Sequence, residues 1–137
     1  MIEFNYETDF LLENESKLSD WIQFCIQEND FKLGEINYVF CDDNYLHKLN
    51  VEFLNHDTLT DIISFDNTLG KLVNGDIFIS IERVQENATV FNTTFSEELH
   101  RVMIHGVLHY LGFKDKTDDE KEEMRSKENQ CLLSLNN

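Results

Sequence analysis

The sequence contains no proline and only five glycines. Because these glycines are scattered, no Pro- or Gly-rich linker marks a domain boundary, and no internal repeat is visible. A chain of 137 residues is long enough to bury a core of its own. We therefore expect a single domain, residues 1–137, whose turns depend on Asn, Asp and Gly.

Cysteines and long apolar runs are also scarce. Cys25, Cys41 and Cys131 are odd in number, lie far apart and form no C-x-x-C pair, which excludes a disulfide framework and a thiolate zinc knot and favours buried thiols. No run approaches the roughly 18 apolar residues of a membrane span, and the first residues, MIEFNYETDF, lack the pattern of a signal peptide. These absences predict a cytoplasmic protein without a membrane partner.

Basic residues are few: 11 Lys and Arg stand against 27 Asp and Glu, a formal net charge of −16. A negative field repels nucleic-acid phosphates and anionic lipid, so net charge alone argues against both as partners. The 41% hydrophobic and 12% aromatic content nevertheless indicates a folded chain rather than a disordered one. Many acidic residues gather near the C-terminus, at Asp118, Asp119, Glu120, Glu122, Glu123 and Glu128.

Apolar patterning predicts four strands, at Ile2–Tyr6, Ile36–Cys41, Ile62–Phe65 and Ile77–Ile81, the last after a turn at Asn74-Gly75-Asp76. Helical periodicity predicts five helices, at Glu15–Glu28, Asn44–Phe53, Arg83–Val90, about Ser96–Leu111, and one beginning after Thr117. Start signals accompany three of them: Asp42 or Asp43, and the capping-box pairs Thr94/Glu97 and Thr117/Glu120. The order β-α-β-α-β-β-α-α-α indicates an α+β domain with a small mixed four-stranded sheet packed by helices.

The helix near the C-terminus carries a histidine pair. His105 and His109 are four residues apart, which puts them on nearly one face of the helix, about 6 Å apart along its axis, where two imidazoles can bind one metal ion. Gly112 is expected to end the helix in the left-handed conformation, so that Asp115 can return as a third ligand. His56, in an earlier loop, is the alternative third ligand.

The same offsets occur in the H-E-x-x-H-x-x-G-x-x-H arrangement of zinc peptidases. Here, however, Gly106 occupies the position of the glutamate that acts as general base in those enzymes, so a peptidase mechanism is weakly supported. Glycine inside a helix costs roughly 1 kcal/mol relative to alanine. We therefore expect a strand or the substrate to approach closely at Gly106.

Three stretches together resemble the YbeY family of bacterial rRNA-maturation endoribonucleases. His105-Gly-Val-Leu-His109-Tyr-Leu-Gly112-Phe is similar to the family's H-G-x-L-H-L-x-G-Y-D-H signature. The segment from Leu49 to Phe65 is similar to L-N-x-x-Y-R-x-x-D-x-P-T-D-V-L-S-F, and Gly75–Ser80 to G-D-I-x-I-S. The resemblance implies a zincin-like α+β fold, one bound zinc ion, and cleavage of single-stranded RNA in small-subunit (16S) rRNA maturation and ribosome quality control.

The sequence departs from the family pattern at several positions, including the following three. The third histidine falls at Asp115, the arginine at Leu54 and a proline at Leu59. A carboxylate can still bind zinc, so zinc remains the expected ion. If the missing arginine contacts the scissile phosphate, another cation must replace it, and the candidates are Arg83, Arg101 and Lys114.

The expected site therefore contains His105, His109 and Asp115 as ligands of one zinc ion, with the fourth position open to water. His105 and His109 are expected to be catalytic, together with Arg101, which shares the face of His105. Glu97 or Glu98 is a candidate to orient a histidine, and Asp61 and Ser64 either line the cleft or cap and pair the strand.

Because the net charge opposes RNA binding, we expect the RNA to be presented by a ribosomal particle or a ribosome-associated protein. The alternatives are a non-catalytic ribosome-assembly factor with a structural metal and a metallopeptidase.

Overall fold

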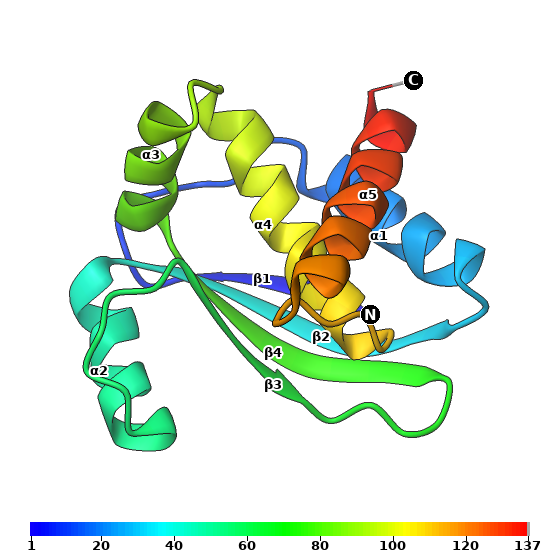
Figure 1. Ribbon diagram of the computed structural model, residues 1–137, viewed down its shortest axis with the longest axis horizontal. Helices are drawn as coiled ribbons and strands as arrows, with labels where there is room; N and C mark the ends of the chain where they lie inside the picture. Colours follow the sequence, from blue (N-terminus) through cyan, green and yellow to red (C-terminus); the bar gives the residue numbers. More distant parts are fainter. Residues whose placement is uncertain (137) are drawn as a thin grey trace.

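The computed structural model describes residues 1–136, so Asn137 of the predicted domain lies outside them. Its elements, in chain order, are β1 (Ile2–Tyr6), α1 (Glu15–Glu28), β2 (Lys32–Cys41), α2 (Asp43–Leu54), β3 (Ile62–Asp66), β4 (Leu72–Ser80), α3 (Ile81–Val90), α4 (Phe95–Tyr110) and α5 (Asp118–Leu135) (Figure 1). The four strands and five helices are those expected from the patterning. None of the helices described is long and apolar enough to cross a membrane.

The strands form one mixed sheet in the order β1-β2-β4-β3. β2 pairs in parallel with β1 and β4, whereas the edge strand β3 runs antiparallel to β4. β2 and β4 are central because their apolar content is nearly continuous, which suits strands that are covered on both faces. The prediction of a small mixed sheet is confirmed.

Helices cover both faces of the sheet. On one face, α1, α3, α4 and α5 pack against Ile36, Tyr38, Phe40, Ile77 and Ile79, which are fully buried. On the other, α2 packs through Leu46 onto a small cluster with Cys41 and Ile63. Figure 1 shows α4 and α5 above the sheet and α2 below it. All three cysteines are buried free thiols, as predicted.

The close approach expected at Gly106 is that of strands. A Cβ placed there would lie 3.0 Å from Cδ1 of Ile62 and 3.1 Å from Cδ1 of Ile77. Two tyrosines also fix α4 to the sheet. The Tyr38 hydroxyl donates to the Met103 carbonyl at 2.9 Å, and the Tyr110 hydroxyl lies 3.0 Å from the carbonyl oxygens of Phe65 and Asp76.

Two strand boundaries were predicted wrongly. β2 begins at Lys32, four residues earlier than expected, and β4 begins at Leu72, so that Asn74-Gly75-Asp76 lies inside a strand instead of forming a turn. Gly75 is required for a different reason: a Cβ there would lie 2.5 Å from the Tyr110 hydroxyl oxygen. Glycine occurs at position 75 because α4 approaches closely there, not because the chain turns. Pairing with β2 continues β4 through this position.

The start of α3 and the capping box of α4 also differ from the prediction. Ile81 belongs to α3, because the Ser80 side chain accepts a hydrogen bond from the Arg83 backbone and caps the helix. Thr94 caps α4 through the Glu97 backbone N–H, but the Glu97 carboxylate accepts from the Thr93 hydroxyl, so only half of that capping box forms. The capping box at Thr117/Glu120 is complete, and Asp42 caps α2.

Candidate metal centre

Helix α4 places His105 and His109 side by side. Their ring centroids are 4.6 Å apart, and their Nε2 atoms are 3.0 Å apart. Gly112 follows with a φ of 98°, the left-handed turn expected at this position. The chain reverses there and brings Oδ2 of Asp115 to 3.1 Å from both Nε2 atoms. Two imidazoles and one carboxylate thus converge on one point.

This triangle fits a tetrahedral metal ion. Ligand atoms about 2.0–2.1 Å from zinc at tetrahedral angles lie about 3.3 Å from one another, close to the observed 3.0–3.1 Å. The side chains of His105, His109 and Asp115 are 22%, 32% and 37% exposed, so an ion can reach them from solvent. Within residues 1–136 this is the one group of three or more potential ligands that converges in this way.

His56, the alternative third ligand, is not part of this group and lies exposed in the loop after α2. The residue that follows it in sequence, Asp57, belongs to a different pair, in which His47 Nε2 lies 2.7 Å from the Asp57 carboxylate. The chain reversal at Gly112 therefore brings Asp115, rather than His56, to the histidine pair.

Helix α5 adds a residue that the sequence reading missed. Glu128 is buried, and its Oε2 atom lies 2.6 Å from Nδ1 of His105. Its other oxygen, Oε1, accepts a hydrogen bond of 2.9 Å from Arg101. Glu128 was read as part of an acidic surface run, whereas its spacing from the buried Met124 and Cys131 places it on the apolar face of α5. That periodicity is the signal that could have found it.

The two groups shift each other's pKa. Burial alone lowers the pKa of His105, but the hydrogen bond and charge of Glu128, with the charges of Asp115 and Asp61, outweigh burial and raise it. Burial likewise raises the pKa of Glu128, but the contacts with His105 and Arg101 outweigh it and lower that pKa. Glu128 is therefore an ionised acceptor, and Nδ1 of His105 carries the proton that it accepts.

A cleft of about 300 Å³ opens beside His105. Its charged lining consists of four carboxylates and two guanidinium groups: Asp61, Glu98, Asp115, Glu128, Arg101 and Arg125. Burial raises the pKa of both Asp61 and Glu98. Asp61 therefore lies in the cleft, but Ser64 is not among its lining residues; Ser64 pairs with Ile77 in the sheet.

The predicted orienting role of Glu97 or Glu98 has no support from hydrogen bonds. Glu97 is exposed and its carboxylate accepts from the Thr93 hydroxyl, and Glu98 lies in the cleft wall. Among the hydrogen bonds of the described residues, the carboxylate partner of His105 Nδ1 is Glu128.

The candidate cations differ in whether their side chains already bind other residues and in whether they line the cleft. Arg83 pairs with Asp43 at 2.9 Å and is not among the cleft residues, and Lys114 is exposed outside the cleft lining. Arg101 lies in the cleft, but its NH1 and NH2 atoms already donate to Glu128 and to Asn129, each at 2.9 Å. Arg125, not singled out from the sequence, lines the cleft with a side chain that is 58% exposed.

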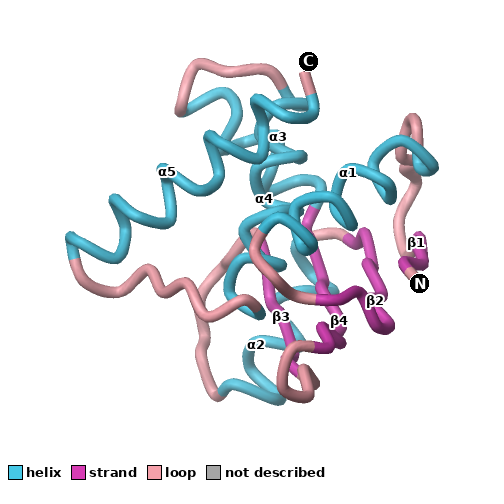
Figure 2. Tube along the Cα trace, turned by 90° about the vertical axis from the view of Figure 1, so that its right-hand side faces the viewer, coloured by secondary structure: helices cyan, strands magenta, loops and turns pink. Residues whose placement is uncertain are grey.

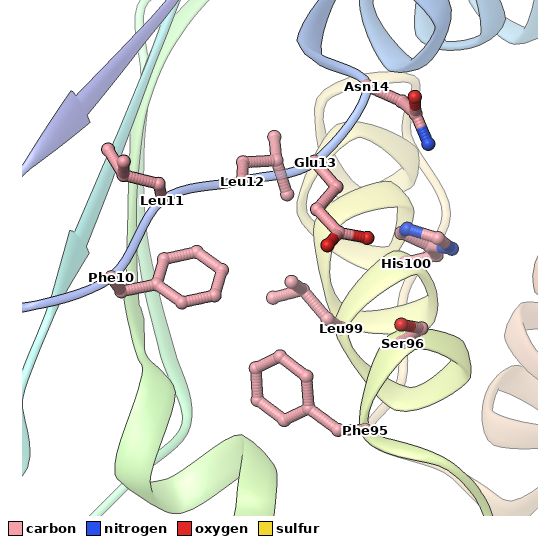
Figure 3. Close-up of a pocket in the computed structure, with 9 residues that line it drawn as sticks. All are labelled: Phe10, Leu11, Leu12, Glu13, Asn14, Phe95, Ser96, Leu99 and His100. Atoms are coloured by element: carbon pink, nitrogen blue, oxygen red, sulfur yellow. The ribbon is translucent and has the colours of Figure 1, made fainter.

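A separate cavity of about 280 Å³ lies between the segment before α1 and the first turns of α4. Figure 3 shows Phe10, Phe95 and Leu99 facing it, with Glu13 and His100 beside them. Its lining mixes apolar and polar side chains and includes none of the three converging ligands. The cleft beside His105 is thus the one that adjoins a potential metal centre.

Comparison with known proteins identifies the family. The family model described as endoribonuclease YbeY matches residues 3–136. This chain belongs to the YbeY family. The endoribonuclease YbeY of Flavobacterium johnsoniae is 61% identical over 96% of this chain and 95% of its own length. That of Christiangramia forsetii is 58% identical over 96% of this chain and 92% of its own.

A solved structure supports the same assignment. The solution structure of TM1509 from Thermotoga maritima superposes with a TM-score of 0.71 at 26% identity, covering 98% of this chain and 89% of that one. The zincin-like α+β fold expected from the YbeY resemblance is therefore confirmed over almost the whole chain. The His105, His109 and Asp115 group lies within the part matched by the YbeY family model.

Proposed function

We propose that this protein is a metal-dependent endoribonuclease that cleaves single-stranded RNA in small-subunit (16S) rRNA maturation and ribosome quality control. The observation that carries the proposal is the convergence of His105, His109 and Asp115 in a chain of the endoribonuclease YbeY family. RNA is the substrate named by that family, and three protein ligands leave an open position, which is typical of catalytic metal sites.

Zinc is the proposed ion, held by the two Nε2 atoms and the Asp115 carboxylate. Two imidazoles favour zinc over magnesium or calcium, while the carboxylate leaves the ion less positive than a third imidazole would. When bound, such an ion supplies polarisation of a phosphoryl oxygen and activation of water. His105 and His109 then act as ligands in the catalytic centre, and Glu128 keeps the proton on Nδ1 of His105.

The charges of the cleft support a metal-dependent encounter with RNA. Four carboxylates and two guanidinium groups leave a formal excess of two negative charges, which one divalent cation cancels. A metal-free cleft thus repels a phosphodiester, whereas a loaded cleft does not. Arg125 lines the cleft with a side chain that is 58% exposed and makes only a long contact of 3.9 Å with Glu128, so we propose it as the first contact for an RNA phosphate.

The formal charge of −16 limits binding outside the cleft. We infer that naked RNA binds weakly at physiological salt and that a ribosomal particle or ribosome-associated protein presents the substrate. We therefore also propose that the protein acts in the cytoplasm, where ribosomal RNA is processed.

The test is cleavage of a single-stranded RNA spanning an rRNA end. We expect the wild-type protein to cleave it, the chelator-treated protein to lose activity, and added zinc to restore it. His109→Ala should lose both bound metal and cleavage, and the same sequence paired in a duplex should resist the wild type. Cleavage that survives chelation, or unchanged zinc content in His109→Ala by elemental analysis, would contradict the proposal.

Two other functions fit the structure less well. A non-catalytic ribosome-assembly factor with a structural metal would be expected to close the site with four protein ligands, whereas three converge within residues 1–136. A metallopeptidase needs a carboxylate next to the first histidine, and the residue there is Gly106, packed against Ile62 and Ile77.

A further inference from the structure

Helix α5 contributes no candidate ligand, but it contacts the metal centre through one buried side chain. Both oxygens of Glu128 are engaged, one by Nδ1 of His105 at 2.6 Å and one by NH1 of Arg101 at 2.9 Å. The Glu128 side chain is only 7% exposed and the Arg101 side chain 16%. A short contact in such a dry environment is strong, because little water competes for it.

The position of Glu128 is fixed by the packing of α5. Met124, Cys131 and Leu132 bury the same face of the helix in the core. The Trp21 indole N–H also donates to the Cys131 carbonyl at 2.7 Å, tying α5 to α1. The carboxylate therefore meets His105 from a rigid element rather than from a mobile loop.

The contact has a direct consequence for the opposite nitrogen of the ring. Because Glu128 accepts from Arg101, which can only donate, and lies 2.6 Å from Nδ1 of His105, Nδ1 carries a proton, and the neutral form of the ring then keeps its lone pair on Nε2. That lone pair points to His109 Nε2 and Asp115 Oδ2, at 3.0 Å and 3.1 Å. Only this tautomer of His105 can donate electrons to an ion at the centre of the triangle.

Arg101 acts on the other side of the carboxylate. Its NH2 atom donates to Asn129 at 2.9 Å, so the guanidinium bridges two consecutive residues of α5. Without that cation, the buried carboxylate would keep only the longer contact with Arg125, at 3.9 Å, and could turn away from His105. With both nitrogens occupied, Arg101 is poorly placed to bind an RNA phosphate.

We propose that Arg101 and Glu128 form a positioning pair that fixes the tautomer and orientation of His105 and so sets the affinity of the centre for zinc. Arg101 acts through Glu128 and does not contact the scissile phosphate. This inference rests on the proposed zinc site, but it concerns two residues outside the ligand set.

The first test is zinc affinity at one fixed pH, measured by competition with a chromophoric chelator. Glu128→Gln keeps the side-chain volume but loses the ionised acceptor, so we expect zinc to bind about 10–100-fold more weakly. Arg101→Gln should also weaken zinc binding. Glu123→Gln, an exposed change on the same helix, should leave zinc affinity unchanged. Circular dichroism checks that all four proteins are folded.

The second test reads the tautomer directly. Long-range ¹H–¹⁵N spectra of the metal-free wild type should show His105 protonated on Nδ1, and Glu128→Gln should shift the ring toward Nε2 protonation. A merely structural role for Glu128 would not move this signal. A wild-type His105 protonated on Nε2 alone would overturn the proposal.

The Arg101 variant separates positioning from phosphate binding. If Arg101→Gln raises the KM for RNA and lowers its salt dependence while zinc affinity stays at the wild-type value, Arg101 contacts the phosphate and the proposal is wrong. Equal zinc affinity in all four proteins would overturn the inference alone, leaving the zinc site intact. A wild type that binds no zinc would overturn the proposed function and this inference together.

Discussion

Helices α4 and α2 are both amphipathic, yet they are anchored very differently. Nine of the 16 residues of α4 are buried, whereas α2 buries only Leu46 and Asn50 among its 12. In Figure 2, α4 lies among the other helices beside the strands and α2 lies at the lower side, apart from them. The difference shows that the candidate ligands are carried by the most constrained helix of the fold.

The anchoring of α2 is local by comparison. Its Asn50 side chain donates to the Thr58 carbonyl at 2.9 Å and holds the loop that follows, while Phe53 and Leu54 point largely to solvent. Leu54, where the family pattern has arginine, is not among the residues lining the cleft. A binding centre needs fixed geometry, and α4 supplies it. Four predictions test this contrast.

Matched truncations of buried leucines should show the largest difference. Leu108 in α4 is completely buried in the main core, and Leu46 in α2 is buried in the small cluster. We expect Leu108→Ala to lower the free energy of unfolding by about 2–5 kcal/mol, with Leu46→Ala at or below the low end of that range. Urea denaturation measures both. An equal or larger loss for Leu46→Ala would break the comparison.

Removing one hydroxyl should have the next largest effect. Tyr110→Phe deletes the group that hydrogen-bonds the Phe65 and Asp76 carbonyls, so we expect a loss of about 1–3 kcal/mol in unfolding free energy. Tyr45→Phe on α2 is the control, because its hydroxyl has no hydrogen bond within residues 1–136. Thermal unfolding distinguishes them. Equal losses would mean that the Tyr110 contacts do not hold α4 on the sheet.

The variant Glu98→Gln tests the electrostatic effect of burying a carboxyl group on α4. Burial, with the charge of Asp61, raises the pKa of Glu98 in the folded protein, so its neutral form stabilises the fold at low pH and that contribution is lost as pH rises through the raised pKa. Glu98→Gln should therefore be more stable than the wild type at pH 7. The difference should vanish near the unfolded pKa of about 4.3.

Urea titrations at several pH values, with a chelator present to remove metal, measure this effect. Glu52→Gln on the exposed face of α2 is the matched control. A stability difference between Glu98→Gln and the wild type that stays constant from pH 4 to pH 7 would contradict the assignment.

The smallest effect is expected on the outer side of α2. Val51 is 44% exposed, and substitutions at exposed positions usually change stability by less than about 0.5 kcal/mol. Val51→Ala should therefore unfold at nearly the wild-type urea concentration. A loss of several times that size would mean that α2 is anchored more firmly than its burial indicates.

Local signals in the sequence predicted most elements well. β1 and α1 match their predicted bounds, and Thr117, Asp42 and Gly112 begin or end their segments as expected. These features depend on neighbouring residues, which a single sequence contains. The spacing of His105, His109 and Asp115 succeeded for the same reason, since one helix and one turn bring them together.

The predictions failed at residues whose role depends on contacts with distant parts of the chain. Gly75 resembled a turn residue because nothing in its neighbourhood reveals Tyr110, which lies against it. Arg101 was read as a free cation because its partners, Glu128 and Asn129, are 27 and 28 residues away. Glu128 was hidden in an acidic run, although its place on the apolar face of α5 marked it as buried. The role of such residues is determined by side-chain contacts between different helices and strands.

The central claim is that one metal ion is held by His105, His109 and Asp115. Diffraction from a zinc-soaked crystal, recorded on both sides of the zinc absorption edge, tests it most directly. We expect one strong anomalous peak between Nε2 of both histidines and Oδ2 of Asp115. No peak there, or a dominant peak at His47 and Asp57 or at His56, would contradict it.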